Sequence, residues 1–380
     1  MSHDLLLKLT QALNVRRSEN AFRSLRNAAD LVDFSSNDYL GFGTQDILHK
    51  DIVEAISSLR HTGSGGSRLL TGNYSLIEHT EEFIAQFHKA PSALYFNSGY
   101  EANVGVISTL TQRGNVILYD KRIHASLHEG IKLSKADAFA FPHNDVAGLE
   151  KLLQDKTGEK WIVVESVYSM DGDLCPLQEI VELAKKYHAH ILLDEAHATG
   201  VIGNRGEGLA QKLGLENDVI IRIHTFGKAI GSNGAVVLCT PLIRDYLINF
   251  CKNFIYTTAP NPLQVTSVLL VYKALAESDK YVQSLHRVLA YFMDRSSGYP
   301  ELHFEATDSA IFSIIIPGNA EVSRAAKYLQ NGGMDVRPIR YPTVARGAER
   351  LRICVHAFNT EMEMVRLFKL LDTIIKDIRN

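Results

Sequence analysis

The chain has 380 residues, of which 46% are hydrophobic and 22% charged, and its formal net charge is −3. The length allows two domains, or one large domain with a smaller one appended, and the composition is that of an ordinary globular protein. The balanced charge gives no support to a role on nucleic acid or on a membrane surface, and no uncharged apolar run reaches the roughly 18 residues that a membrane helix needs.

The first segment and the cysteines favour a cytoplasmic protein without a metal site. Asp4 and Lys8 interrupt the apolar positions of the N-terminal segment, which is unlike the apolar core of a secretory signal. The four cysteines are scattered without CxxC spacing, so the sequence predicts neither a zinc site nor a disulfide framework.

The first 72 residues predict a helix, a short strand, a second helix and a glycine-rich segment. Residues 4–26 have helical periodicity, and residues 31–42 (LVDFSSNDYLGF) form a short strand that runs into a polar turn. Residues 46–59 predict an amphipathic helix. The glycine-rich segment 61–72 (HTGSGGSRLLTG) follows that helix and lacks GxGxxG spacing, so it is not a dinucleotide-binding fingerprint. It indicates tight backbone close to a ligand or a chain partner.

From residue 75 onward strands and helices alternate, which predicts an α/β fold with a mainly parallel sheet covered by helices. Ligands of such sheets bind at the carboxyl ends of the strands, where several polar residues follow apolar runs. The apolar runs are residues 93–96, 116–119, 138–141, 161–165 and 189–193. The polar residues are Ser98, Gly99, Tyr100, His124, Ser169, Asp194, Glu195 and His197.

The alternation stops near residues 261–296, which predict a long helix. Strand patterns return in short runs, and a terminal helix begins at Glu361. We therefore expect an N-terminal helix and strand segment (1–40), a large α/β domain (41–285) and a smaller α+β domain (286–380). The late strands are residues 310–316, 335–336 and 351–355.

One lysine, Lys228, stands between two buried strands in residues 218–238 (DVIIRIHTFGKAIGSNGAVVL). A phosphate-binding P-loop is excluded, because it needs a glycine at Arg222 and a serine or threonine at Ala229. Two interpretations remain from this stretch alone. Lys228 is either a solvated loop residue or a lysine whose amine forms a Schiff base with a carbonyl.

Asp194 ends a buried strand, and alone it is either a structural cap or the partner of a positively charged ligand atom. His197 and His124, each taken alone, could equally be satisfied core histidines. Together with Lys228 they suit a pyridine cofactor, with the lysine for its aldehyde, the aspartate for its ring nitrogen and a histidine stacked on the ring. An ionised aspartate keeps that nitrogen protonated.

These residues lie in motifs that resemble the α-oxoamine synthases, which are fold-type I enzymes dependent on pyridoxal phosphate (PLP). The resemblance runs almost from end to end, in the same order along the chain. The motifs are FSSNDYLG, GSGGSRLLTG, FNSGYEAN, HASLHEG, ESVYSMDGD, LDEAHATGVIG, HTFGKAIGSNGA and IRYPTVARGAERLRI.

The resemblance implies PLP as the cofactor and a role for each polar residue around its ring. Lys228 would form the Schiff base and carry the proton at the α-carbon of the amino acid. Asp194 would pair with the pyridinium nitrogen, and His197 with the 3-oxygen of the ring. His124 would stack on the ring, and Ser169 would lie close to its reactive face.

The resemblance also implies how the phosphate and the substrates are held. Backbone groups at a helix N-terminus and two threonines, one of them from the partner subunit, would bind the phosphate. These residues are Ser98, Gly99, Tyr100 and Thr225, with Thr258 of the partner subunit. Asn37 and Arg352 would hold the amino acid carboxylate, Arg352 as a bidentate fork, and Arg23 would meet the far end of the acyl thioester.

By this resemblance we expect a homodimer with shared active sites and small-molecule substrates. The expected reaction is the decarboxylative condensation of L-alanine with pimeloyl-CoA or a pimeloyl-carrier protein. GSGGSRLLTG and Arg23 favour this reaction over those of glycine C-acetyltransferase, 5-aminolevulinate synthase and serine palmitoyltransferase, which stay open as alternatives. A catalytically silent PLP-binding regulator is disfavoured because Lys228, Asp194 and both histidines are present.

Overall fold

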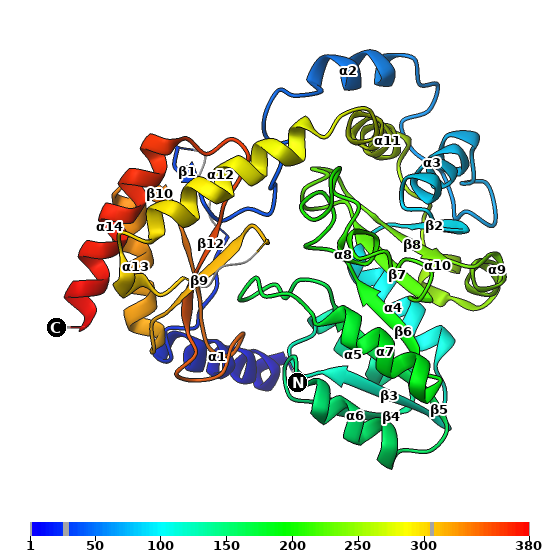
Figure 1. Cartoon of the computed structure of the whole chain (residues 1–380), viewed down its shortest axis with the longest axis horizontal. Helices are drawn as coiled ribbons and strands as arrows, with labels where there is room; N and C mark the ends of the chain where they lie inside the picture. Colours follow the sequence, from blue (N-terminus) through cyan, green and yellow to red (C-terminus); the bar gives the residue numbers. More distant parts are fainter. Residues whose placement is uncertain (1, 26–29, 305–307, 380) are drawn as a thin grey trace.

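The computed structural model of the protein describes residues 2–25, 30–304 and 308–379. Its larger part is built on a seven-stranded sheet (Figure 1). In spatial order the strands are β2 (Ser92–Phe96), β8 (Ala235–Cys239), β7 (Ile221–Thr225), β6 (His190–Asp194), β5 (Glu159–Glu165), β3 (Asn115–Asp120) and β4 (Asp137–Phe141).

The prediction of a mainly parallel sheet is confirmed. Strands β4, β3, β5, β6 and β7 pair in parallel, whereas β8 runs antiparallel to both of its neighbours, β7 and β2. The central strands β7 and β8 are buried along their whole length, as expected for apolar strands covered on both faces. The carboxyl ends of the parallel strands therefore meet at one edge of the sheet.

Helices before, between and after the strands cover this sheet, and several begin at a side chain that accepts a backbone N–H. Ser98, His124, Asp145, Thr240 and Asn261 are such N-caps. The helices are α3 (Ser75–Phe87), α4 (Gly99–Leu110), α5 (Ala125–Ser134), α6 (Val146–Asp155), α7 (Leu177–Tyr187), α8 (Leu209–Lys212), α9 (Pro241–Phe250), α10 (Lys252–Ile255) and α11 (Pro262–Glu277).

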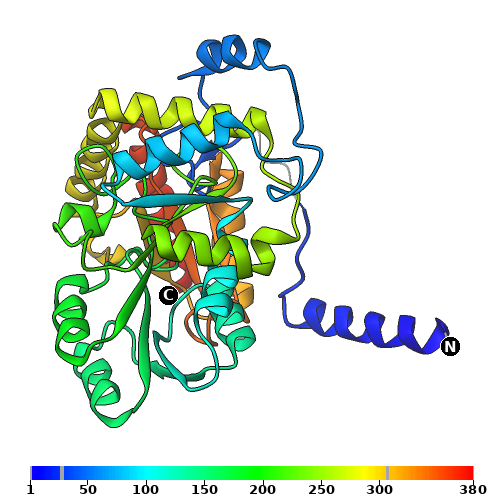
Figure 2. The same cartoon turned by 90° about the vertical axis from the view of Figure 1, so that its right-hand side faces the viewer.

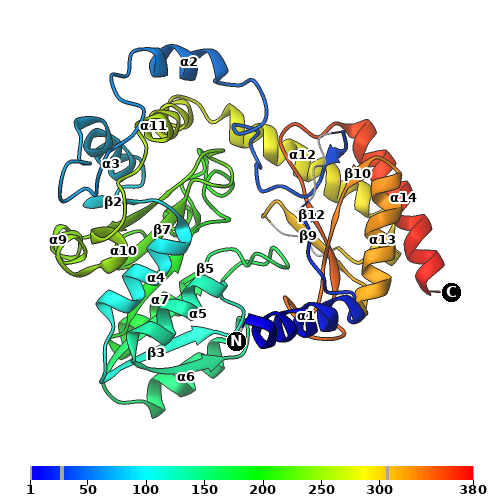
Figure 3. The same cartoon turned by 180° about the vertical axis from the view of Figure 1, so that it is seen from behind.

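The smaller part contains a three-stranded antiparallel sheet in the order β11 (Arg337–Ile339), β12 (Arg350–Cys354), β9 (Ile311–Ile315). A short N-terminal strand, β1 (Val32–Asp33), pairs in parallel with β10 (Met334–Asp335), so the start of the chain joins the C-terminal part (Figure 3). The accompanying helices are α12 (Lys280–Ser296), η1 (Pro300–Leu302), α13 (Asn319–Asn331) and α14 (Glu361–Arg379).

The long helix expected over residues 261–296 is wrong, because α11 ends at Glu277 and α12 begins at Lys280. Ser278 is extended, and its hydroxyl accepts the N–H of Lys280 at 3.2 Å. A serine side chain that competes for backbone donors in this way interrupts a helix despite apolar periodicity on both sides.

The first predicted helices are shorter than expected. Helix α1 (Ser2–Ser18) ends before Arg23, and α2 (His49–Ser57) is contained within the predicted range 46–59. Residues 26–29 of the first prediction lie outside the described residues. None of the helices within the described part of the chain is long and apolar enough to cross a membrane.

The expected domain boundary after residue 285 falls inside α12. We propose instead that the smaller domain begins with α12 and also includes β1, which is hydrogen-bonded to β10. Figure 1 shows α12 leading from α11, beside the large sheet, to β9 and α14.

Candidate active site

A cavity of about 240 Å³ opens at the carboxyl ends of the parallel strands. The adjacent strands β5, β6 and β7 end in Glu165, Asp194 and Thr225, and all three residues line it. Nine of the residues predicted from sequence meet at this cavity. They are Asn37, Ser98, Gly99, Tyr100, His124, Asp194, His197, Thr225 and Lys228.

Asp194 is buried, and both of its carboxylate oxygens are held by N–H donors. The backbone N–H of Ala196 donates to Oδ1 at 2.9 Å, and Nδ2 of Asn103 donates to Oδ2 at 2.7 Å. Nδ2 of Asn103 also donates to the hydroxyl of Ser126, at 2.9 Å, and that hydroxyl lies 2.7 Å from Nδ1 of His124. One network therefore orients both the carboxylate and the His124 ring.

His197 is buried beside Tyr39, whose hydroxyl lies 2.7 Å from Nδ1 of the imidazole. Burial holds the pKa of His197 well below its ordinary value, and the positive charges of Lys228 and Arg352 act in the same direction. The ring is therefore neutral at pH 7, which lets it exchange a hydrogen bond with a ligand oxygen without adding charge to the cavity.

Lys228 lies in the loop between β7 and β8 and lines the cavity. Burial lowers the pKa of its ammonium group, Asp194 and Glu165 oppose this shift, and Arg352 adds to it. Within the described residues its side chain has no hydrogen-bond or ion-pair partner. A lysine with a depressed pKa and no competing partner is suited to nucleophilic chemistry on a carbonyl.

The N-terminus of α4 fits a phosphate group. Its cap residue Ser98 accepts the N–H of Glu101 at 3.1 Å, and Gly99 and Tyr100 line the cavity together with Thr225. A Cβ at Gly99 would lie 2.3 Å from Cγ2 of Thr225, so glycine is required at this close approach. Oγ1 of Thr225 is buried and lacks a hydrogen-bond partner among the described residues. Its hydroxyl is therefore available to donate a hydrogen bond to a bound anion.

Arg352 is hydrogen-bonded to Asn37, which lines the cavity, although Arg352 itself is not among the lining residues. Nη2 of Arg352 donates to Oδ1 of Asn37 at 3.0 Å, and Nε donates to the backbone oxygen of Ser169 at 2.6 Å. Ser169 thus contacts Arg352 through its carbonyl, and it is not among the residues that line the cavity.

Four predicted site residues do not line the cavity of this single chain: Ser169 and Arg352, described above, and Thr258 and Arg23. Thr258 is exposed, and its backbone oxygen accepts Nδ2 of Asn97 at 2.7 Å. Arg23 is also exposed and donates to the hydroxyl of Thr343 at 2.8 Å.

Sequence reasoning missed four polar residues of the site: Asn103, Ser126, Tyr39 and Glu165. Glu165 accepts the backbone N–H of His124, and burial raises its pKa well above the ordinary value, with a further contribution from Asp194. Its position as the last residue of β5 was a usable signal, because the strand-end argument that selected Asp194 applies equally to it. Tyr39 and Asn103 had no such signal, since their partners are remote in sequence.

The fold and these side chains define a PLP-dependent fold-type I protein, and the model of the class I and II aminotransferases matches residues 29–371. The chain belongs to that family, and within it to the α-oxoamine synthases. It is 42% identical to the 8-amino-7-oxononanoate synthase of Emericella nidulans, over 96% of this chain and 94% of that protein.

Two solved structures are also similar. The 8-amino-7-oxononanoate synthase of Francisella tularensis has a TM-score of 0.77 and 29% identity, and the match covers 92% of this chain and 98% of that one. The serine palmitoyltransferase of Sphingomonas wittichii has a TM-score of 0.86 and 25% identity, and it covers 100% of this chain and 98% of that one. The predicted fold class is confirmed.

Proposed function

We propose that the protein condenses L-alanine with a pimeloyl thioester, of CoA or of a carrier protein, to form 8-amino-7-oxononanoate, CO2 and the free thiol. This is the reaction of 8-amino-7-oxononanoate synthase in biotin biosynthesis. The observation that carries the reaction class is the meeting of Lys228 with Asp194, His124 and His197 in one cavity. The relative at 42% identity supports this particular member of the family.

The residues of the cavity fit PLP as the cofactor. When bound, PLP supplies an electron sink that stabilises negative charge at the α-carbon of an amino acid. The donors at Ser98, Gly99 and Tyr100, with the hydroxyl of Thr225, would hold its phosphate at the start of α4. Asp194, fixed by Asn103, would keep a proton on the ring nitrogen.

The remaining residues would act on the substrate. Lys228 would anchor the cofactor covalently and then move the proton at the α-carbon, a task that its lowered pKa favours. The guanidinium of Arg352, together with the amide of Asn37, would bind the carboxylate of the amino acid. His124 would cover one face of the ring, and His197 would bond to its 3-oxygen.

The second candidate is condensation of L-serine with a long-chain acyl thioester, which the similarity to serine palmitoyltransferase over the whole chain favours. The carboxylate clamp cannot choose between amino acids, because every substrate of the family carries that group. Discrimination depends on space beside the α-carbon, where one methyl group is worth about 1–3 kcal/mol. The acyl chain contributes about 0.8 kcal/mol for each buried CH₂, so the donor should be selected more strongly.

Product mass spectrometry tests the proposal directly. Purified protein loaded with PLP is offered alanine, glycine or serine, each with pimeloyl-CoA, acetyl-CoA or palmitoyl-CoA. We expect the largest kcat/KM for L-alanine with pimeloyl-CoA and a modest preference for alanine over glycine. Preferred use of glycine with acetyl-CoA, or of serine with palmitoyl-CoA, would refute the proposed member of the family.

We also propose a homodimer in which each site is completed by the partner subunit. Helix α1 extends away from the rest of the chain (Figure 2) and exposes Leu5, Leu6 and Leu9 at 59%, 62% and 52%. Leu70, in the glycine-rich segment, is 81% exposed, as is Tyr256. Ala259 donates its N–H to the backbone oxygen of Gly66, so the segment that carries Tyr256 lies beside the glycine-rich segment that carries Leu70. Exposed large apolar side chains on two hydrogen-bonded segments are typical of a subunit interface.

The four cysteines are buried free thiols. Unpaired cysteines fit a reducing compartment, and on that ground we propose a cytoplasmic location.

A further inference from the structure

Residues 166–175, which follow β5, form a turn that packs against the smaller sheet. The bridge between Val167 and Leu174 closes this turn, and the N–H of Tyr168 donates to the backbone oxygen of Asp173 at 3.0 Å. Gly172 has φ +78°, and a Cβ there would lie 2.1 Å from the backbone oxygen of Ile311 in β9. The turn therefore lies in direct contact with the smaller sheet at a place where only glycine fits.

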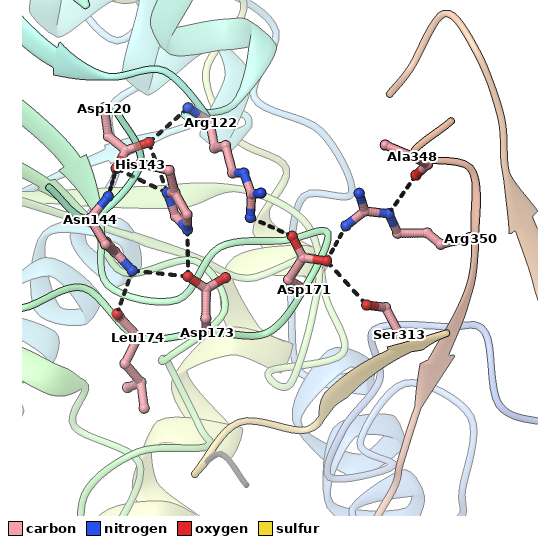
Figure 4. Close-up of polar contacts among 10 residues, drawn as sticks. All are labelled: Asp120, Arg122, His143, Asn144, Asp171, Asp173, Leu174, Ser313, Ala348 and Arg350. Carbon is pink, nitrogen blue, oxygen red and sulfur yellow. Dashed lines mark hydrogen bonds and ion pairs between the residues drawn. The ribbon is translucent and has the colours of Figure 1, made fainter. Parts of the chain in front are cut away.

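Asp171, at the tip of this turn, binds side chains from three separate segments (Figure 4). Oδ2 accepts Nη1 of Arg122, which follows β3, at 2.6 Å. Oδ1 accepts the hydroxyl of Ser313 in β9, at 3.1 Å, and also Nη1 of Arg350 in β12. The carboxylate thus joins the larger part of the molecule, through Arg122, to two strands of the smaller sheet.

A second residue of the same turn, Ser169, binds Arg352. Nε of Arg352 donates to the backbone oxygen of Ser169, two residues before Asp171, at 2.6 Å. Arg350 and Arg352 are two residues apart in β12 and therefore share one face of the strand. Ser313 lies directly opposite Arg352 in the antiparallel ladder, so its side chain is on that face too. The turn binds this face at two points.

We propose that Asp171 is a positioning residue for the amino acid substrate. By holding Arg350 and Ser313, it sets the place of β12 relative to the turn and so aims the guanidinium of Arg352 at the cavity. This proposal rests on the proposed function, in which Arg352 binds the carboxylate of the amino acid. Asp171 itself would touch no substrate and does not line the cavity at the strand ends.

The charges explain why the link depends on a carboxylate. Asp171 lies between two guanidinium groups, and the side chain of Arg350 is only 7% exposed. Removing the negative charge leaves a buried cation without its counter-charge and two arginines that repel each other. The strand that carries Arg352 would then shift away from the turn.

Asp173 provides a matched control on the same turn. Its Oδ2 lies 2.5 Å from Nε2 of His143 and accepts Nδ2 of Asn144 at 2.9 Å, and Figure 4 shows this contact on the side of the turn away from β12. Asp173→Asn changes the anchorage of the turn to the larger part without touching Arg350 or Ser313. A merely structural role of the turn would make both aspartates equally sensitive.

The test compares Asp171→Asn, Asp171→Glu and Asp173→Asn in the full-length PLP-loaded protein. Equilibrium dialysis with radiolabelled L-alanine gives the Kd, steady-state kinetics give the KM for pimeloyl-CoA, and thermal unfolding reports stability. We expect Asp171→Asn to raise the Kd for L-alanine by about tenfold to 10²-fold, because a displaced guanidinium loses its charged hydrogen bond to the substrate carboxylate, and such bonds contribute about that factor to affinity. The KM for pimeloyl-CoA should change less than twofold, as should the Kd in Asp173→Asn.

Asp171→Glu, which keeps the charge, should recover part of the lost affinity. Arg350→Gln should raise the Kd for L-alanine as Asp171→Asn does, and the double variant should be no worse than the single ones, because the two residues act along one route. If Asp171→Asn does not fold, Ser313→Ala tests the same route with a smaller expected rise in the Kd.

The outcomes separate this inference from the proposed function. Wild-type protein that binds L-alanine and uses pimeloyl-CoA, beside an Asp171→Asn variant of unchanged Kd, would overturn the positioning role alone. An equal rise in Asp173→Asn would also overturn it. Wild-type protein that binds no amino acid would overturn the proposed function, and the inference with it.

Discussion

Nδ2 of Asn103 lies 2.7 Å from Oδ2 of Asp194, so an amide from helix α4 fixes the carboxylate at the end of β6. Asp194→Asn should keep the fold, because the amide has the shape of the carboxylate and its oxygen still accepts one of the two N–H donors, although its NH2 group then faces the other. We expect kcat to fall roughly 10²-fold or more, the scale seen when one preorganised electrostatic contact is lost. Turnover and thermal unfolding measured on the same sample check this. Near wild-type turnover in a folded Asp194→Asn variant would rule out the proposed role. Asn103→Ala keeps the carboxylate of Asp194, so its kcat should fall less.

Lys228 should carry the cofactor covalently. Treating the PLP-loaded protein with borohydride should fix the cofactor to this residue, and peptide mapping by mass spectrometry locates the adduct. Lys228→Ala should bind PLP weakly and lose about 10²–10⁴-fold in kcat, because its proton-transfer group is gone. An adduct on any other lysine would contradict the assignment.

Arg23 should act on the acyl donor alone. If its guanidinium meets the distal carboxylate of the pimeloyl chain, Arg23→Ala removes a charged hydrogen bond worth about 1.5–3 kcal/mol, which is roughly a tenfold to 100-fold rise in the KM for pimeloyl-CoA. The Kd for L-alanine should stay within about twofold. Thr343→Val is the matched control, since it removes the present partner of Arg23 and keeps the guanidinium. Equal effects on both substrates would exclude this role.

The proposed dimer depends on the exposed apolar surface around the glycine-rich segment. Leu70→Glu places a charge at a position that is 81% exposed in the single chain and should shift the protein toward monomers with little activity. Met362→Glu, at an 83% exposed position of α14, should leave both properties unchanged. Light scattering and turnover measure the two effects. A wild-type monomer with full activity would refute shared sites.

His143 should make stability depend on pH above neutrality. Burial alone would lower its pKa, but hydrogen bonds and charges from Asp120 and Asp173 outweigh burial and raise the pKa to about 9. The unfolded value is 6.5, so the protonated ring stabilises the fold below about pH 6.5, and this contribution is lost as the pH rises from 6.5 to about 9. It amounts to about 3 kcal/mol at most.

Urea unfolding at pH 6 and pH 9.5 tests this dependence. The free energy of unfolding of wild type should fall over this interval by more than that of His143→Gln. His49→Gln, an exposed histidine of α2, should follow wild type. An equal fall in the free energy of unfolding of wild type and of His143→Gln between the two pH values would show that protonation of this ring does not stabilise the fold.

The reaction class and the main sheet could be predicted without the structure because their signals are local. An apolar run of strand length followed by a polar residue marks the end of a parallel strand, and this pattern selected Asp194. The same pattern applied to Glu165 would have found it as well. The lysine between two apolar runs was equally visible, although only the motifs around it decided between a solvated loop and a reactive amine.

The α/β class and most residues of the cavity therefore follow from local patterns in the chain. The distant side chains that complete the cavity follow from long-range packing, which no local pattern predicts. Tyr39 lies 158 residues before His197, and Asn37 lies 315 residues before Arg352. These pairs form because β1 adds to β10 and because the turn after β5 packs on β12, and such long-range packing leaves no periodic trace in the residues it joins. The break between α11 and α12 has a local cause instead, since one serine hydrogen bond outweighs a continuous helical pattern.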